Sequence, residues 1–135
     1  MTLDDFVGLP YCEGARGPDA YDCYGLVAAV LRAMRGVELP DWYQPTSGPA
    51  GASRAISAAL AGEVAGGRSI RINWPDAAPE DYDIAIVGSA SRPHHVGVVA
   101  SGGVLHSSKA FGSTWHSLPR FLTFYPRTEF YKWAP

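Results

Sequence analysis

The stretch YDCYGLVAAVLRAMRG, residues 21–36, decides the fold because it has the pattern of one capped helix beginning beside a cysteine. Asp22 is expected to be the N-cap, since a short carboxylate accepts hydrogen bonds from the free N–H groups of a first turn. Apolar residues recur at helical spacing along one face, and Gly36 supplies a typical C-terminal end. The pattern therefore places Cys23 on the first turn of a helix that buries one face.

The composition is that of one compact domain, residues 1–135. A chain of 135 residues with 47% hydrophobic content is long enough to bury a core. Its 11 basic residues are scattered, so a nucleic acid partner is not expected. No apolar run approaches the ~20 residues of a membrane span, and the start MTLDDFVGLP lacks the pattern of a signal peptide. We therefore expect synthesis in the cytosol without a signal peptide, and no membrane insertion.

The hydrophobic pattern changes from helical to strand-like along the chain. A second helix is expected over residues 54–64, capped by Ser53. Later segments are short, rich in β-branched or aromatic residues, and bounded by Gly, Pro and Ser. Helices first and strands second, without βαβ alternation, predict an α+β domain with N-terminal helices packed on an antiparallel sheet of about five strands. The expected strands cover residues 69–74, 82–87, 95–100, 103–107 and 121–133.

The cysteine at the helix start is a candidate nucleophile. Backbone N–H groups and the positive end of the helix dipole favour a thiolate, which lowers the pKa of a thiol from ~8.5. We expect Cys23 to titrate below ~7, with the pKa shifted upward when His95 is replaced. The alternative is that Cys23 is a small buried apolar residue.

Two histidines lie in a predicted hairpin, RPHHVGVVASGGVLHSS, residues 92–108. With any two-residue turn, His95 and His106 lie on the same face of the sheet. A turn at Ser101-Gly102 pairs His106 with Gly97 and leaves His95 as a diagonal neighbour at roughly 7 Å. A turn one residue later separates the histidines by roughly 13 Å. We favour the nearer register.

Together these residues fit nucleophilic catalysis, in which a cysteine needs a base and the base needs a polar group that orients its ring. Cys23, His95 and His106 are expected to take these roles in that order. The other two histidines, His94 and His116, are expected to be solvated or capping residues at the surface. Such chemistry requires no metal or other cofactor.

With these residues and their spacing, the chain resembles the NlpC/P60 family of papain-like cysteine peptidases. The resemblance spans nearly the whole chain and implies a papain-like fold. Its five ordered motifs are Pro10-Tyr11, Asp22-Cys23-Tyr24-Gly25-Leu26-Val27, Asp83 before IAIV, His95-Val96-Gly97-Val98 and Leu105-His106.

Carried over to these positions, the resemblance implies that Cys23 is the nucleophile, His95 the general base and then acid, and His106 the orienting residue. Tyr11 matches a tyrosine whose hydroxyl lies near the cysteine, where it could help to bind the oxyanion; packing in the core is the alternative. Asp22 and the residue after the cysteine contact the substrate in several members. Tyr24 stands at this position in place of the common serine.

The sequence also departs from the family pattern at the residue before Asp83. Tyr82 replaces the glycine of Gly-Asp, and Asp83 itself is expected to be a turn or strand-edge residue. The aromatic Tyr24, followed by RGVELPDWY, resembles the branch of the family found in bacteriophage tail proteins. This branch implies a protein made in the bacterial cytoplasm and carried in the virion tail, acting in the periplasm or cell wall beside other tail proteins.

The resemblance implies hydrolysis of an amide bond in the stem peptide of bacterial peptidoglycan, between D-glutamate and the diamino acid. One alternative is a structural tail-assembly protein with little or no hydrolytic activity. Another is an acyltransferase that uses the same Cys-His chemistry on a different amide or ester.

Overall fold

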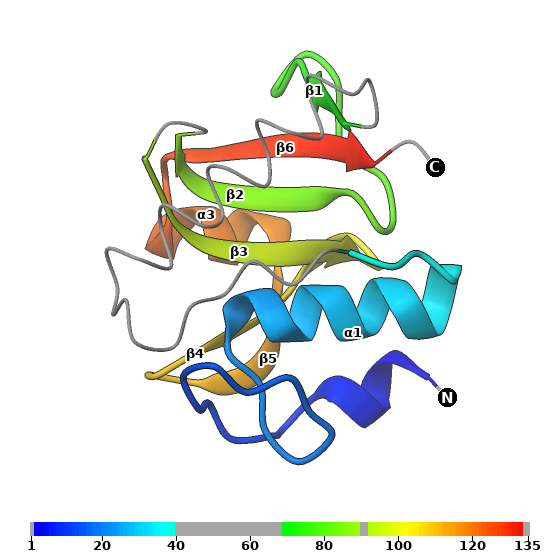
Figure 1. Cartoon of the computed structure of the whole chain (residues 1–135). Helices are drawn as coiled ribbons and strands as arrows, with labels where there is room; N and C mark the ends of the chain where they lie inside the picture. Colours follow the sequence, from blue (N-terminus) through cyan, green and yellow to red (C-terminus); the bar gives the residue numbers. More distant parts are fainter. Residues whose placement is uncertain (1, 40–68, 90–91, 134–135) are drawn as a thin grey trace.

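The computed structural model describes residues 2–39, 69–89 and 92–133 (Figure 1). The helix expected over residues 54–64 lies outside the described residues. In chain order the elements are η1 (Leu3–Phe6), α1 (Cys23–Arg35), β1 (Ser69–Ile72), β2 (Ile84–Ser89), β3 (Arg92–Ala100), β4 (Gly103–Ser108), β5 (Gly112–Ser117), α3 (Leu118–Phe124) and β6 (Thr128–Trp133).

The strands form a six-stranded antiparallel sheet in the order β1-β6-β2-β3-β4-β5. This sheet confirms the predicted α+β class. One strand more than expected is present, because β5 has the sequence GSTWHS, without the alternation of apolar residues that identifies a half-buried strand.

The segment expected to be a strand over residues 121–133 is a helix followed by a strand. Ser117 caps α3 by accepting a hydrogen bond from the Arg120 N–H, and Pro119 lies in the first turn. A hydroxyl cap followed by proline is a helix-start signal. The strand prediction is therefore wrong for the part of α3 that it covered, and β6 begins at Thr128.

Helices α1 and α3 cover opposite faces of the sheet, as Figure 1 shows. On one face, α1 buries Leu26, Val30 and Leu31 against strand residues such as Val96 and Val98. On the other face, α3 buries Phe121 in a second apolar cluster that includes residues of β2, β3, β4 and β6. Burial of apolar surface on both faces makes the sheet the centre of the domain.

The capping of α1 confirms the prediction from the sequence. Asp22 Oδ1 accepts a hydrogen bond of 2.6 Å from the Gly25 N–H. Gly36 ends the helix in the left-handed conformation, with φ of 65°. The first residue of α1 is therefore Cys23, near the end of the sheet where β3 begins and β4 ends (Figure 1).

The β3–β4 hairpin has the nearer of the two registers. Ser101 and Gly102 have φ values of 52° and 77°, and positive values at both positions define the tight turn that suits a twisted hairpin. Ala100 pairs with Gly103, and Gly97 pairs with His106. The predicted Ser101-Gly102 turn is confirmed.

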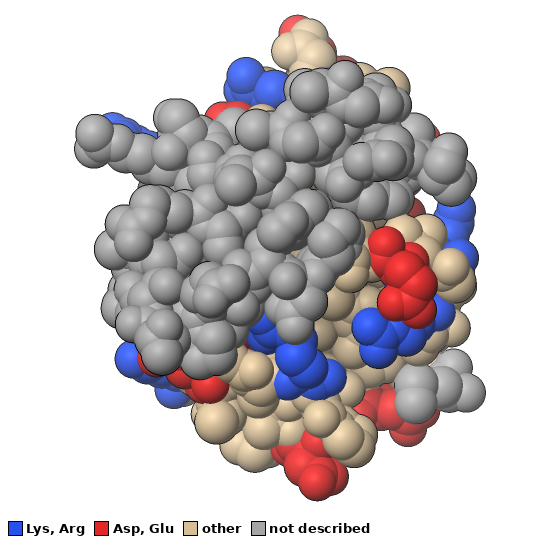
Figure 2. All heavy atoms as spheres, in the orientation of Figure 1, with Lys and Arg blue, Asp and Glu red and all other residues tan. Residues whose placement is uncertain are grey.

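Basic and acidic side chains are interspersed over the described part of the face in Figure 2. In the described ranges, no helix combines the length and apolar character that crossing a membrane requires.

Candidate active site

The site begins where strands β3 and β4 separate. Val99 exchanges backbone hydrogen bonds with the β2 side, so its N–H and C=O face away from β4. Backbone groups of successive strand residues point to alternate neighbours, and the N–H of Val96 therefore faces β4. Pairing between these strands ends at Gly97–His106, one residue before Val96 would be reached. The Val96 N–H is consequently available for another acceptor.

That acceptor is the sulfur of Cys23. The Val96 N–H is hydrogen-bonded to it and, together with the backbone N–H groups of Tyr24 and Cys23, lowers the pKa of the thiol. Nearby, the Ser107 hydroxyl donates a 2.9 Å hydrogen bond to the carbonyl of Tyr21, which fixes the segment before α1 against β4. The thiol thus lies in the opening between the two strands, beside the backbone of Val96, the residue that follows His95 on β3.

The thiol of Cys23 is protonated at neutral pH. Burial around the sulfur raises its pKa to about 12, the adjacent charge of Asp22 raises it further, and the backbone N–H groups oppose both effects. Part of the residue is still exposed. The expectation of a pKa below ~7 is therefore wrong for this structure, because loss of hydration outweighs the helix terminus. A nucleophilic attack by this sulfur requires a base.

His95, which precedes Val96 on β3, is a neutral imidazole at neutral pH. It is 7% exposed, and burial lowers its pKa to about 3, followed by the effects of His106 and His94. Its ring centroid lies 5.0 Å from that of Tyr125, whose pKa is raised by burial and then by the charge of Cys23. Both observations place Cys23, His95 and Tyr125 in one cluster.

His106 is hydrogen-bonded to the Nε2 atom of His95. The His95 Nε2 and His106 Nδ1 atoms are 2.9 Å apart, so the predicted meeting of these histidines is confirmed. His106 is fully buried, and burial followed by His116 lowers its pKa to about 4. With its Nε2 engaged, His95 has Nδ1 left for the thiol.

His116 is a site residue that the sequence prediction missed. Its Nδ1 lies 2.9 Å from His106 Nε2, and the side chain is half-buried. The expectation of a solvated histidine is therefore wrong for His116, whereas His94 is exposed as expected. Pairing of Val104 with His116 in the unpredicted strand β5 places the third imidazole diagonal to His106 on the same face. No group of three or more His, Cys, Asp or Glu residues in the described part of the chain is arranged to hold a metal ion.

Asp22 and Tyr24 interact with the arginine of the preceding loop. Arg16 Nη1 lies 2.9 Å from both carboxylate oxygens of Asp22, which also accepts from the Gly14 N–H. The same guanidinium lies 5.5 Å from the centre of the Tyr24 ring. Asp22 is 3% exposed and engaged by donors of this chain, so its capping role accounts for the carboxylate. The predicted substrate contacts of both residues stay predictions.

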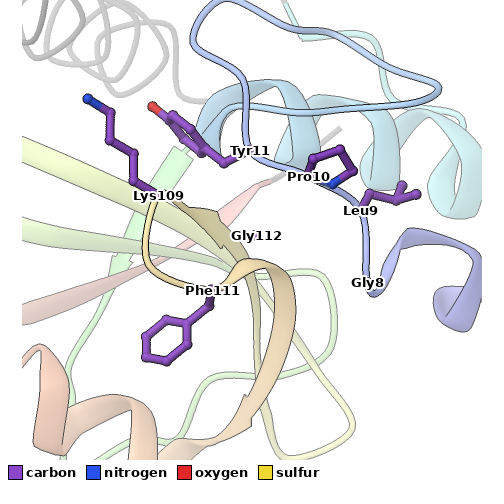
Figure 3. A pocket seen from close by; sticks show the side chains of 7 residues that line it. All are labelled: Gly8, Leu9, Pro10, Tyr11, Lys109, Phe111 and Gly112. Carbon is purple, nitrogen blue, oxygen red and sulfur yellow. The ribbon is translucent and has the colours of Figure 1, made fainter.

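A shallow cleft of about 510 Å³ lies beside Tyr11. Figure 3 shows the side chains of Tyr11 and Lys109 extending in the same direction from the N-terminal segment and the loop after β4, while Phe111 points elsewhere. The backbone of Tyr11 bridges to Tyr21, just before the start of α1. This places Tyr11 near the segment that delivers Cys23, and its role in binding the oxyanion stays a prediction.

Asp83 has a structural role at the start of β2. One oxygen accepts a 2.7 Å hydrogen bond from the Glu80 N–H, and the other lies 3.2 Å from Lys132 Nζ. This arrangement agrees with the expected turn residue. Tyr82 has a φ of 71°, a conformation that favours glycine, and so keeps the backbone geometry of the residue it replaces.

The chain belongs to the NlpC/P60 family, which it matches over residues 8–118. The NlpC/p60 domain of the peptidoglycan hydrolase SagA has a similar fold, with a TM-score of 0.58 and 18% identity over 93% of this chain and 87% of that one. NlpC1 from Trichomonas vaginalis gives a TM-score of 0.59 and 19% identity, covering 93% of this chain and 40% of its own. A search of curated proteins finds no match.

Proposed function

We propose that this chain is a cysteine peptidase that hydrolyses an amide bond in bacterial peptidoglycan. The observation that carries the proposal is that the buried Cys23 thiol lies against the N–H of Val96, the residue that follows His95, and that His95 Nε2 lies 2.9 Å from His106 Nδ1. Membership of a family whose peptidoglycan hydrolases are cysteine peptidases supports the substrate class. The resemblance in sequence further suggests the bond between D-glutamate and the diamino acid of the stem peptide.

The mechanism follows from the neutral state of both groups. His95 Nδ1 takes the thiol proton as the sulfur attacks the carbonyl carbon, and the carbonyl oxygen becomes an oxyanion. Tyr11 and backbone N–H groups are the proposed donors to that oxyanion. The tetrahedral intermediate then expels the amine, which receives its proton from His95. A water molecule, deprotonated by His95, hydrolyses the resulting thioester and regenerates Cys23.

The direct test is digestion of purified sacculi and of a synthetic stem peptide, with products weighed by mass spectrometry. The wild-type protein should release new amine and carboxyl ends, and Cys23→Ala should lose about 10³-fold or more of the rate. Cys12→Ala is the matched control, since Cys12 is the exposed cysteine and should be dispensable. Absence of cleavage by wild type, or equal rates in Cys23→Ala, would overturn the proposal.

We further propose that the protein acts from a bacteriophage tail, where local hydrolysis of the wall would aid penetration. The support is the DCYGLV motif with its aromatic Tyr24 and the later GVELP stretch. Mass spectrometry of purified phage particles would show whether the protein is part of the virion. Its absence from intact virions would contradict this proposal.

Two alternatives have their own signatures in the same assays. A structural tail protein would be present in particles and would show no difference between wild type and Cys23→Ala on sacculi. An acyltransferase would form an acylated Cys23 that an added amine or alcohol discharges faster than water does. The mass of the trapped adduct identifies the acyl group.

A further inference from the structure

The site contains one imidazole more than a nucleophile, a base and an orienting residue require. We propose that His116 is a positioning residue, which accepts a hydrogen bond from His106 Nε2–H and thereby keeps His95 Nδ1 free to accept the thiol proton. The inference rests on the proposed role of His95, but its test uses the thiol alone and needs no peptidoglycan substrate.

The contacts among the three imidazoles limit where their hydrogens can lie. Both His95 and His106 are buried and neutral near pH 7, since burial lowers their pKa values to about 3 and about 4. A neutral imidazole carries one N–H and one acceptor nitrogen. The two 2.9 Å contacts, His95 Nε2 to His106 Nδ1 and His106 Nε2 to His116 Nδ1, each need one hydrogen. All three rings must therefore carry their hydrogen on Nε2, or all three on Nδ1.

These two arrangements of the hydrogens, called here the Nε2 order and the Nδ1 order, differ in whether His95 can accept the proton of the thiol. With hydrogens on Nε2, the Nδ1 of His95 is an acceptor and can take the proton of Cys23. With hydrogens on Nδ1, His95 already has a hydrogen on that nitrogen and cannot act as a base there. The active order is thus the one in which His116 Nδ1 is an acceptor.

His116 makes the active order possible because His106 is fully buried. Without an acceptor at position 116, a hydrogen on His106 Nε2 would be buried and unsatisfied, which costs about 1–3 kcal/mol. The hydrogen would instead move to His106 Nδ1, where His95 Nε2 accepts it. That shift forces the hydrogen of His95 onto Nδ1 and removes the base.

The surroundings of His116 keep it in place and neutral. Its ring centroid lies 5.0 Å from that of Phe111 and 5.1 Å from that of Phe124. Burial and then the positive charge of Arg120 on α3 lower its pKa. Towards the core it faces His106 of β4. The ring is thus held between two partly exposed phenylalanines, with Nδ1 directed inward.

The test compares two substitutions of His116 in a Cys12→Ala background, with iodoacetamide as the probe of Cys23 at pH 7. His116→Phe keeps an aromatic ring between the phenylalanines but has no acceptor, and should slow alkylation about tenfold, the lower range for loss of an orienting partner. His116→Asn has an amide oxygen near the position of Nδ1 and should stay within about threefold of wild type. His94→Asn removes an exposed imidazole that takes no part in the two hydrogen bonds linking His95, His106 and His116, and should stay within about threefold of wild type.

Nitrogen NMR of labelled histidines supplies a readout that packing alone would not alter. His95 and His106 should carry hydrogen on Nε2 in wild type and in His116→Asn, and on Nδ1 in His116→Phe. The inference would be overturned if wild type and His116→Phe were alkylated at equal rates, or if His116→Phe and His116→Asn were slowed equally. It would also be overturned if the tautomers of His95 and His106 were the same in His116→Phe as in wild type. If Phe unfolds the protein, His116→Leu replaces it as the variant without an acceptor. If the alkylation rates were as expected but the wild-type protein did not hydrolyse peptidoglycan, the result would count against the proposed function and not against the role of His116.

Discussion

Gly97 shows how a single residue sets the geometry of the site. It pairs with His106, and a Cβ at this position would lie 2.5 Å from Val104 Cγ1 and 3.2 Å from His106 Cβ. The missing side chain therefore leaves the space in which the His106 ring meets His95.

Gly97→Ala should lower the free energy of unfolding by about 1–3 kcal/mol, because overpacking forces neighbours to move. It should also slow alkylation of Cys23, since His106 is displaced. Gly102→Ala is the control in the same hairpin: its φ of 77° strains an alanine, but nothing lies within 4 Å of the added Cβ. Urea unfolding should show a lower stability for both variants, whereas the alkylation rate of Cys23 should fall only in Gly97→Ala. Equal alkylation rates in the two variants would contradict this account.

The positions of the candidate site residues could be predicted from the sequence better than their protonation could. Cys23, His95 and His106 could be predicted because a short turn fixes strand register and a helix start fixes the cysteine. The raised pKa of Cys23 could not, since hydration of the sulfur depends on the packing of α1 against β3. His116 was missed because recognising it requires strand β5, whose sequence is mostly polar.

At the scale of elements, the start of α1 positions the nucleophile. Asp22 caps the helix through Gly25 and also forms an ion pair with Arg16. Asp22→Ala should lower the free energy of unfolding by about 2 kcal/mol, since it removes the cap and leaves Arg16 without this partner. Asp22→Asn keeps a capping oxygen and should cost less. Urea denaturation measures both, and equal losses would show that the cap contributes little.

The element that the sequence misassigned shows where local pattern fails. Residues 121–124 contain Phe, Leu and Thr, which suit a strand, but they form the end of α3. The decisive information was upstream, in the Ser117 cap and Pro119, and in the burial of Phe121 against the far face of the sheet. Tertiary packing overrides intrinsic preference in such short segments.

At the scale of the whole molecule, the buried histidines make stability depend on pH. His95 and His106 have pKa values lowered by burial, so the unfolded chain, where a histidine titrates near 6.5, binds protons more readily. Stability is therefore fully present above about pH 6.5 and falls as the pH decreases towards the folded values of about 4 and about 3.

Thermal unfolding between pH 7 and pH 5 should show this loss, in a range where ordinary carboxyl groups stay largely ionised. His106→Leu removes one of the two groups and should flatten the dependence. His94→Asn, at an exposed position, should change the slope less than His106→Leu does, since His94 contributes least to the lowered pKa of His95. A melting temperature that stays constant over this range in wild type would show that the histidines are not buried as described.

The central claim is that His95 takes the proton of Cys23, and the most direct measurement is the rate of Cys23 alkylation against pH in a Cys12→Ala background. At pH 7 the protein with His95 should react at least about tenfold faster than His95→Gln, which can still contact His106 but has no basic nitrogen. The variant should gain reactivity only as the pH rises towards the raised pKa of the thiol. Identical profiles for the two proteins would contradict the account.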